Sequence, residues 1–289
     1  MSRAGRSRLG AAAVVLGACF SALVTAPASA CPGLDPCRVE GGDYLALPPP
    51  GWDGASPLPA TIFFHGYGSS AAVVASDPSF TAAFAREGVL LVLPNGLGGS
   101  WAHTGSPSRA RDELAFMDAA RRDLLARFPV DPDRLLVTGF SQGGSMVWEL
   151  ACHRGSTFAP AYAPVAGAFW EPLPATCPGG LIDLRHVHGT SDGTVPLAGR
   201  VIRGQFRQGD VVRGMAVLRA TNGCAASIPG RAVVEEAADG LRCEVWDGCA
   251  VGGRELRLCL HEGGHILPES WVTAIHAWAR GLPSHGSER

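Results

Sequence analysis

The sequence predicts an α/β protein with a mostly parallel central sheet and helices on both faces. Short apolar segments alternate along the chain with longer amphipathic segments, and glycine- or proline-rich turns bound many of them. That alternation is typical of parallel strands that are buried on both faces and joined by helices. Apolar residues make up 46% of the 289 residues and charged residues only 17%, which excludes a largely disordered chain.

The individual elements are predicted from apolar periodicity and from the turn residues that bound them. The helix over 111–128 has apolar residues at helical spacing, acidic residues early, and Pro129 just beyond its end. Segment 44–47 is expected to be an edge strand within a stretch rich in proline, glycine and aspartate. Further strands are expected over 60–64, 89–93, 134–138, 161–168, 182–187, 241–246 and 256–260, and further helices over 80–86, 145–152, 206–221 and 271–280.

Residues 1–30 have the three parts of a secretory signal. Three arginines in the first eight residues precede an apolar run over 9–24, and Ala28, Ser29 and Ala30 follow as a cleavage site. The apolar run is short for a membrane span, so no membrane insertion is expected. A signal anchor and a lipoprotein cut before Cys19 are the alternatives.

Cleavage after Ala30 predicts a secreted or periplasmic protein. We expect one domain over 31–282, a frayed tail over 283–289, and a monomer.

The cysteines indicate disulfides. Eight of the nine remain after Ala30, and an even number behind an export signal favours up to four bonds. Cys243 and Cys259 lie symmetrically about Val251 in a predicted hairpin, within bonding reach of each other. The remaining pairs are assigned by nearness and then by elimination. They are Cys31–Cys37, Cys152–Cys177 and Cys224–Cys249.

Charge and composition exclude several classes of protein. All 24 basic residues are arginine, which excludes a Walker-type phosphate loop, a Schiff base with pyridoxal phosphate, kinase-type chemistry and serine–lysine nucleophile pairs. The formal net charge of −2 becomes −5 when three arginines leave with the signal, so no nucleic-acid partner is expected. No CxxC spacing for a closed zinc site occurs. We expect neither a metal nor a cofactor.

A candidate nucleophile lies in the segment GFSQGG, between the predicted strand 134–138 and the helix that begins at Ser145. In a strand–turn–helix context, G-x-S-x-G predicts a tight elbow that exposes the serine hydroxyl. Ser141 is therefore the candidate nucleophile. A glycine-rich turn with an idle serine is the alternative reading.

A serine nucleophile needs a base, and the base needs an orienting acid. Asp192 follows the strand over 182–187, and His265 follows the strand over 256–260. Both are expected at the sheet edge that carries Ser141, in the chain order serine, acid, histidine.

Other acids and histidines compete for the same roles. Asp183 lies at the far end of its predicted strand, and a capping role explains Asp210. His261 and His188 lie close to strand ends, where local packing or bonding explains them. Position and chain order together favour His265 as the base.

The oxyanion of an acyl-transfer reaction needs two backbone N–H groups. Gln142, directly after the nucleophile, and Tyr67, in the loop HGYG, are the candidates. Loops at this edge line the pocket in such sheets. The substrate-lining candidates are His65, Gly66, Asn95 and Trp101, although a plain packing role explains Trp101 equally well.

Seven sequence blocks are spread over most of residues 60–280, namely FFHGYGSS, LPNG, FPVDPDRLLVTGFSQGGSM, APVAG, HGTSDGTVP, NGC and HEGGHILP. Together they resemble a known family, the secreted esterases of the α/β-hydrolase fold known as polyhydroxybutyrate depolymerases, which are related to feruloyl and acetylxylan esterases. The resemblance implies the α/β-hydrolase fold. It also implies Ser141 as nucleophile, Asp192 as acid, His265 as base, and an oxyanion loop at Gly66 and Tyr67.

The chain departs from that family in two respects. No polymer-binding domain follows the last predicted helix, and the stretch between APVAG and the strand at 182 is too short for a large lid. The resemblance implies a serine esterase that acts on hydroxyalkanoate oligomers or polymer. The alternative is a carbohydrate esterase that releases ferulate or acetate from feruloylated or acetylated polysaccharide. A serine peptidase and a non-catalytic binding module are the remaining rivals.

Overall fold

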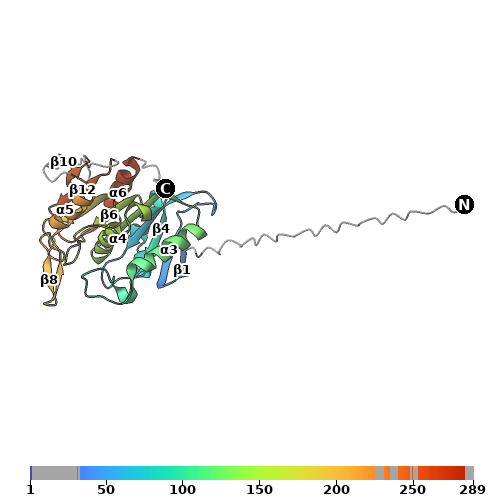
Figure 1. Cartoon of the computed structure of the whole chain (residues 1–289), viewed down its shortest axis with the longest axis horizontal. Coiled ribbons are helices and arrows are strands. Elements are labelled where there is room, and N and C mark those ends of the chain that lie inside the picture. The colour runs from blue at the N-terminus through green and yellow to red at the C-terminus, as the bar shows by residue number, and fades with distance from the viewer. Residues whose placement is uncertain are drawn as a thin grey trace.

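Figure 1 shows the computed structural model of the chain. It describes residues 1, 31, 33–224, 231–234, 240–247, 249 and 253–283. The expected signal over 1–30 and the expected tail over 283–289 lie outside the described residues, apart from Met1 and Pro283.

A ten-stranded sheet forms the centre of the molecule, in the order β1-β2-β4-β3-β5-β6-β7-β12-β11-β10. The strands from β4 to β12 in this order pair parallel, and the pairs outside them are antiparallel. The mostly parallel sheet expected from the sequence is therefore confirmed. Its strands are β1 Gly33–Val39, β2 Gly42–Leu47, β3 Leu58–Phe64, β4 Leu90–Pro94, β5 Val130–Phe140, β6 Ala161–Val165, β7 Asp183–Gly189, β10 Arg231–Val234, β11 Arg242–Trp246 and β12 Leu256–His261.

Helices cover both faces of the sheet. Phe116 of α3, Trp148 of α4 and Met215 of α5 belong to one buried apolar cluster. Phe84 of α2 and Trp271 of α6 belong to clusters on the opposite face. The helices are α1 Ala71–Ala75, α2 Pro78–Arg86, α3 Glu113–Arg127, α4 Gln142–Phe158, α5 Val211–Thr221 and α6 Ser270–Gly281, with a 3₁₀ turn over Leu97–Gly99.

Aspartates begin three of these helices. Asp77, Asp112 and Asp210 each accept hydrogen bonds from backbone N–H groups of the first turn of α2, α3 and α5. Such caps satisfy donors that have no partner inside the helix. The capping role that explained Asp210 from the sequence is therefore present in the structure.

Two predictions about the strands were wrong. Segment 44–47 lies in β2, which is not an edge strand, because β1 pairs with it on one side and β4 on the other. Segment 206–221 is not one helix. Its first residues form β9, Phe206–Gln208, which pairs with β8, Arg200–Ile202, in the separate hairpin at the lower left of Figure 1.

Four disulfides cross-link the chain, in the pairs expected from the sequence. Cys243 and Cys259 are direct partners in the β11–β12 pairing, as a hairpin requires. The other bonds are Cys31–Cys37, Cys152–Cys177 and Cys224–Cys249. In the described part of the chain, no helix is both long and apolar enough to cross a membrane.

Candidate active site

Ser141 lies between the last residue of β5 and the first residue of α4. Its φ of 60° and ψ of −122° are a combination that residues other than glycine rarely adopt. The Ser141 N–H donates to the Val165 carbonyl of β6 at 3.0 Å. Glycines let the chain turn this tightly: a Cβ at Gly143 would overlap the Phe64 carbonyl, and one at Gly144 the Val165 carbonyl. The turn has the geometry of a nucleophile elbow.

Asp192 and His265 are hydrogen-bonded to each other, with 2.7 Å between Asp192 Oδ2 and His265 Nδ1. The other carboxylate oxygen, Oδ1, accepts the backbone N–H groups of Thr194 and Val195, both at 2.8 Å. The Asp192 carboxylate is buried, and hydrogen bonds to both of its oxygens hold it in one orientation. Because the carboxylate can only accept, His265 carries its proton on Nδ1, which leaves Nε2 free to take a proton.

Backbone hydrogen bonds hold the loops of these two residues together. β7 and β12 are parallel neighbours, and each ends just before one of the loops. The Thr190 N–H donates to the His261 carbonyl at 2.8 Å, and the Ser191 N–H donates to the Gly263 carbonyl at 3.2 Å. Gly189 makes this approach possible, since a Cβ there would overlap the Gly263 carbonyl.

The elbow and the acid–base pair meet at Phe140, the residue directly before Ser141. The Phe140 ring lies 4.6 Å from the His265 ring, centroid to centroid. The three residues predicted from the sequence as nucleophile, acid and base therefore lie on neighbouring loops at one edge of the sheet. This arrangement is able to perform acyl transfer, in which a base activates a serine and the acid stabilises the charged base.

The two candidate oxyanion amides lie on either side of Ser141. Gln142 follows it, and the Gly66–Tyr67 turn passes over it, since a Cβ at Gly66 would lie 3.5 Å from Ser141 Cβ. In the part of the chain that the structure describes, neither the Gln142 nor the Tyr67 N–H donates to a protein acceptor. Both amides are therefore available to bind an anion.

Two of the predicted substrate-lining side chains lie in the protein interior. His65 and Trp101 are both buried, which for Trp101 agrees with the packing role that the sequence leaves open. His65 Nε2 accepts the Gly96 N–H at 3.0 Å, and the Trp101 indole N–H donates to the His65 carbonyl at 2.8 Å. Burial lowers the pKa of His65. The two residues hold together the loops that follow β3 and β4.

Asn95, which is half-buried, connects the loop after β4 to helix α1 and to strand β2. Its side-chain oxygen accepts the Ala71 N–H at 2.8 Å, and its side-chain nitrogen donates to Asp43 Oδ1 at 2.6 Å. Gly66 is the predicted lining residue that lies directly beside the nucleophile.

The competing acids and histidines have local roles. Asp183 is buried and pairs with Arg254 at 2.7 Å. His261 Nδ1 accepts the Gly263 N–H at 3.0 Å, and its ring packs against Trp271. Burial lowers the pKa of His261.

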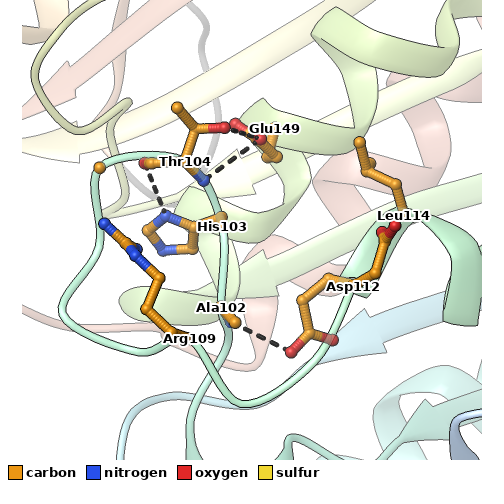
Figure 2. A pocket seen from close by; sticks show the side chains of 9 residues that line it. Ala102, His103, Thr104, Arg109, Asp112, Leu114 and Glu149 are labelled. Carbon is orange, nitrogen blue, oxygen red and sulfur yellow. Dashed lines mark hydrogen bonds between the residues drawn. The ribbon is translucent and has the colours of Figure 1, made fainter.

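A hollow of about 360 Å³ lies beside the loop that follows Trp101, and Figure 2 shows it from close by. No residue of the Ser141 site lines it. Glu149 of α4 accepts the backbone N–H and the hydroxyl of Thr104 at 3.2 and 2.6 Å, and Glu113 of α3 accepts the Ala102 N–H at 3.0 Å. These carboxylates attach the loop to both helices. No local sequence pattern indicates this role, because each contact joins residues that lie far apart in the chain or in different elements.

Three exposed apolar residues lie next in the chain, or in the next loop, to residues of the candidate site. Tyr67, Leu97 and Ile266 are among the exposed large apolar residues. Tyr67 follows Gly66, and Ile266 follows His265. The Gly68 N–H donates to the Gly99 carbonyl at 2.7 Å, which brings the turn with Leu97 beside the loop with Tyr67. Within the described residues, no group of His, Cys, Asp and Glu side chains is arranged to hold a metal ion.

Comparison with known proteins supports the fold seen here. No known protein-family profile matches the chain. The acetyl xylan esterase from Aspergillus awamori superposes with a TM-score of 0.55 at 12% identity, covering 78% of this chain and 89% of that one. The parallel sheet, the elbow after β5 and this likeness define an α/β-hydrolase fold.

Curated relatives are similar to the chain in sequence. Feruloyl esterase C of Emericella nidulans is 30% identical over 171 residues, which are 57% of this chain and 60% of that protein. A probable feruloyl esterase C of Aspergillus terreus is 27% identical over 199 residues, 66% of this chain and 70% of that one. The chain thus spans less than two thirds of the first of these relatives.

Proposed function

We propose that this protein is a serine carboxylic ester hydrolase. The observation that carries the proposal is the Asp192–His265 hydrogen bond of 2.7 Å, next to a serine in a strained elbow. An idle serine would not require the unusual backbone of Ser141, and a structural histidine would not require the buried carboxylate on its Nδ1. The curated relatives, which are named esterases, support the same chemistry.

The mechanism is a two-step acyl transfer. His265 Nε2 takes the Ser141 proton, and the hydroxyl oxygen attacks the ester carbonyl carbon. The N–H groups of Tyr67 and Gln142 bind the oxyanion, and Asp192 stabilises the imidazolium. His265 then gives its proton to the leaving alcohol. In the second step His265 takes a proton from water, and the water oxygen attacks the carbonyl carbon of the acyl group on Ser141. The bond to Ser141 Oγ breaks, His265 returns the proton to Oγ, and the acid is released.

The substrate that we propose is an ester of an aromatic acid on a carbohydrate, as in feruloylated polysaccharide. The names of the relatives support this class better than a polyester. The exposed apolar side chains of Tyr67, Leu97 and Ile266 offer contact to an aromatic acyl group beside the nucleophile.

Released acids distinguish this proposal from the polyester reading that the sequence resemblance suggested. The oxidised protein is incubated with feruloylated oligosaccharide and with hydroxybutyrate oligomer, and the acids are separated by chromatography. We expect ferulate. Hydroxybutyrate alone would make the protein a polyester hydrolase with the same three residues, and a free amine from peptide substrates would make it a peptidase.

Ser141→Ala is the direct test of the nucleophile. Turnover of methyl ferulate should fall at least about a thousandfold, because the covalent step is lost. Ser145→Ala is the matched control on the same helix. Its hydroxyl accepts the Ala168 N–H at 3.1 Å, so it should lose stability but retain turnover. Near-full activity of Ser141→Ala, or no mass increase of the wild-type protein with a fluorophosphonate, would refute the proposal.

We also infer export, with residues 1–30 as a removed signal. Four disulfides support it, because such bonds persist in oxidising compartments. The intact mass of the protein from the periplasm or medium should correspond to a chain that begins at Cys31. An uncleaved N-terminus would contradict this.

A further inference from the structure

Two buried imidazoles lie behind the candidate catalytic acid. His186 and His188 are on one face of β7, and neither is exposed to solvent. His186 Nε2 and His188 Nδ1 are 2.9 Å apart. His188 Nε2 is 2.7 Å from the Val195 carbonyl oxygen and 3.6 Å from Asp192 Oδ2. A row of ring nitrogens therefore ends at the carboxylate that orients His265.

The hydrogen-bond partners at the two ends of this row determine which ring nitrogens carry a proton. The Trp148 indole N–H, which can only donate, lies 3.3 Å from His186 Nδ1. The Val195 carbonyl can only accept, so His188 carries its proton on Nε2. A neutral His188 then accepts on Nδ1 from His186 Nε2–H, and His186 Nδ1 accepts from the indole. The hydrogen bonds then run in one direction, from the Trp148 indole through His186 and His188 to the Val195 carbonyl, beside Asp192.

The opposite direction is less favourable. The Pro164 carbonyl lies 3.0 Å from His186 Nδ1 and would accept a proton there. That arrangement leaves His188 Nε2 bare against the Val195 carbonyl at 2.7 Å, and it also faces the Asp192 carboxylate. The opposite direction thus places the His188 Nε2 lone pair against two oxygen atoms. The first direction has one such contact, between the His186 Nδ1 lone pair and the Pro164 carbonyl at 3.0 Å, and it is therefore the more favourable. Burial lowers the pKa of both histidines, so the neutral forms are the relevant ones.

Val195 is the residue through which the row acts. Its carbonyl accepts from His188, while its N–H donates to Asp192 Oδ1 at 2.8 Å. His188 therefore fixes the turn that holds the carboxylate, and its N–H also presents partial positive charge to Oδ2.

We propose that His188 is a positioning residue for Asp192, held in one tautomer by His186 and Trp148. The proposal rests on the proposed function, in which Asp192 orients His265. The proposal assigns a role to the hydrogen-bond chain from Trp148 to Val195, which lies behind Asp192.

The expected pH effect follows from the charges around His188. The titratable groups that face it are His186 on its own strand, Asp192 in the next loop, and His261 and His265 from the β12 side. Removing the His188 N–H leaves more negative charge on Asp192, which then stabilises the His265 imidazolium more strongly. The acid limb of kcat/KM, which reports the base of the free enzyme, should move to higher pH.

The test compares His188→Leu with His188→Gln, whose amide N–H can replace Nε2–H. For His188→Leu we expect kcat on methyl ferulate to fall roughly 10- to 100-fold with KM nearly unchanged, because the Val195 turn loses its hydrogen bond to His188 and holds the Asp192–His265 pair less rigidly. The acid limb should rise by about 0.5 pH unit. His188→Gln should restore most of both. His276→Leu is the matched control, since His276 is buried and bonded to Thr61 at 2.8 Å, on helix α6.

The proposal would be overturned if the His188→Leu protein folds and keeps the wild-type kcat and the wild-type acid limb of kcat/KM. It would also be overturned if His276→Leu shifts the acid limb as much as His188→Leu does. Should His188→Leu not fold, Trp148→Phe removes the terminal donor and keeps an aromatic ring in the core, and an unchanged acid limb in that variant would overturn the proposal.

Imidazole ¹⁵N spectra provide a readout that needs no turnover. Both His186 and His188 should carry the proton on Nε2, and the low-field signal of His265 Nδ1–H should shift in His188→Leu. A proton on His186 Nδ1 would overturn the directed chain. Failure of the proposed function would instead appear as a wild-type protein without esterase activity.

Discussion

Ser141 has a backbone conformation that costs free energy for any residue with a side chain. The elbow keeps it because the glycines around it remove the steric conflict. Gly143 packs directly on the Phe64 carbonyl of β3, and Gly144 on the Val165 carbonyl of β6. The position of the serine hydroxyl thus depends on the absence of two Cβ atoms next to it.

Gly143→Ala should destabilise the protein severely, by about 3 kcal/mol or more, because the added Cβ overlaps a backbone carbonyl of a central strand. Chemical denaturation measures the loss. Gly281→Ala is the control, since that glycine ends α6 with open space around it. Equal stability of the two variants would mean that the elbow is not packed as described.

The sequence predicts single residues well where a motif fixes the backbone. The elbow at Ser141 and the strand-end positions of Asp192 and His265 are read from local patterns and chain order. The burial of Trp101 is not, because its indole bonds to His65, 36 residues earlier in the chain. Such a contact depends on the path of two loops, which no local pattern encodes.

At the scale of elements, β12 delivers His265 to the site, and its alignment is fixed covalently. Cys243 of β11 and Cys259 of β12 are direct partners and are bonded to each other. A shift of β12 by one residue would turn its side chains to the opposite face. The disulfide therefore fixes the register of the strand that precedes the base.

Replacing Cys243 and Cys259 together by serine should lower the free energy of unfolding by about 3 kcal/mol, from the loop-closure entropy of the unfolded chain. Their sequence separation is 16 residues, against 6 for Cys31 and Cys37. The same double replacement at Cys31 and Cys37 should cost only about 2 kcal/mol. Denaturant titration of both variants measures the difference, and the reverse order would contradict the argument.

Most central strands and helices were predictable because each has a clear apolar pattern. β1 has none: Asp35 and Pro36 lie inside it, and Cys37 is its only buried residue. It is defined by pairing with β2, which is a long-range contact. The helix predicted over 206–221 begins too early, although Asp210 is a recognisable cap that marks the start of α5 at Val211.

At the scale of the whole molecule, several buried histidines make stability depend on pH. Burial is the main cause of a lowered pKa at each of them, and that of His103 falls to about 4. The others are His65, His186, His188, His261 and His276. The unfolded chain takes up these protons near pH 6.5, whereas the folded protein does so only at lower pH.

Stability should therefore fall as the pH drops below about 6.5, because the unfolded state then binds more protons. Tm should fall by several degrees between pH 7 and pH 5, a window above the titration of ordinary carboxylates. Scanning calorimetry across this range measures it. His103→Gln should show a smaller slope, since one buried imidazole is gone. A Tm that rises on acidification would contradict the assignment.

β1 forms one border of the ten-stranded sheet, and within the described residues no strand pairs with its outer side. An unpaired border can recruit the border of another molecule and start aggregation. Here Pro36 lacks the N–H that such pairing needs, the register is irregular between Gly33 and Cys37, and Cys37 is tied back to Cys31. This border is consequently a poor template for intermolecular β-pairing, which favours colloidal solubility at high protein concentration.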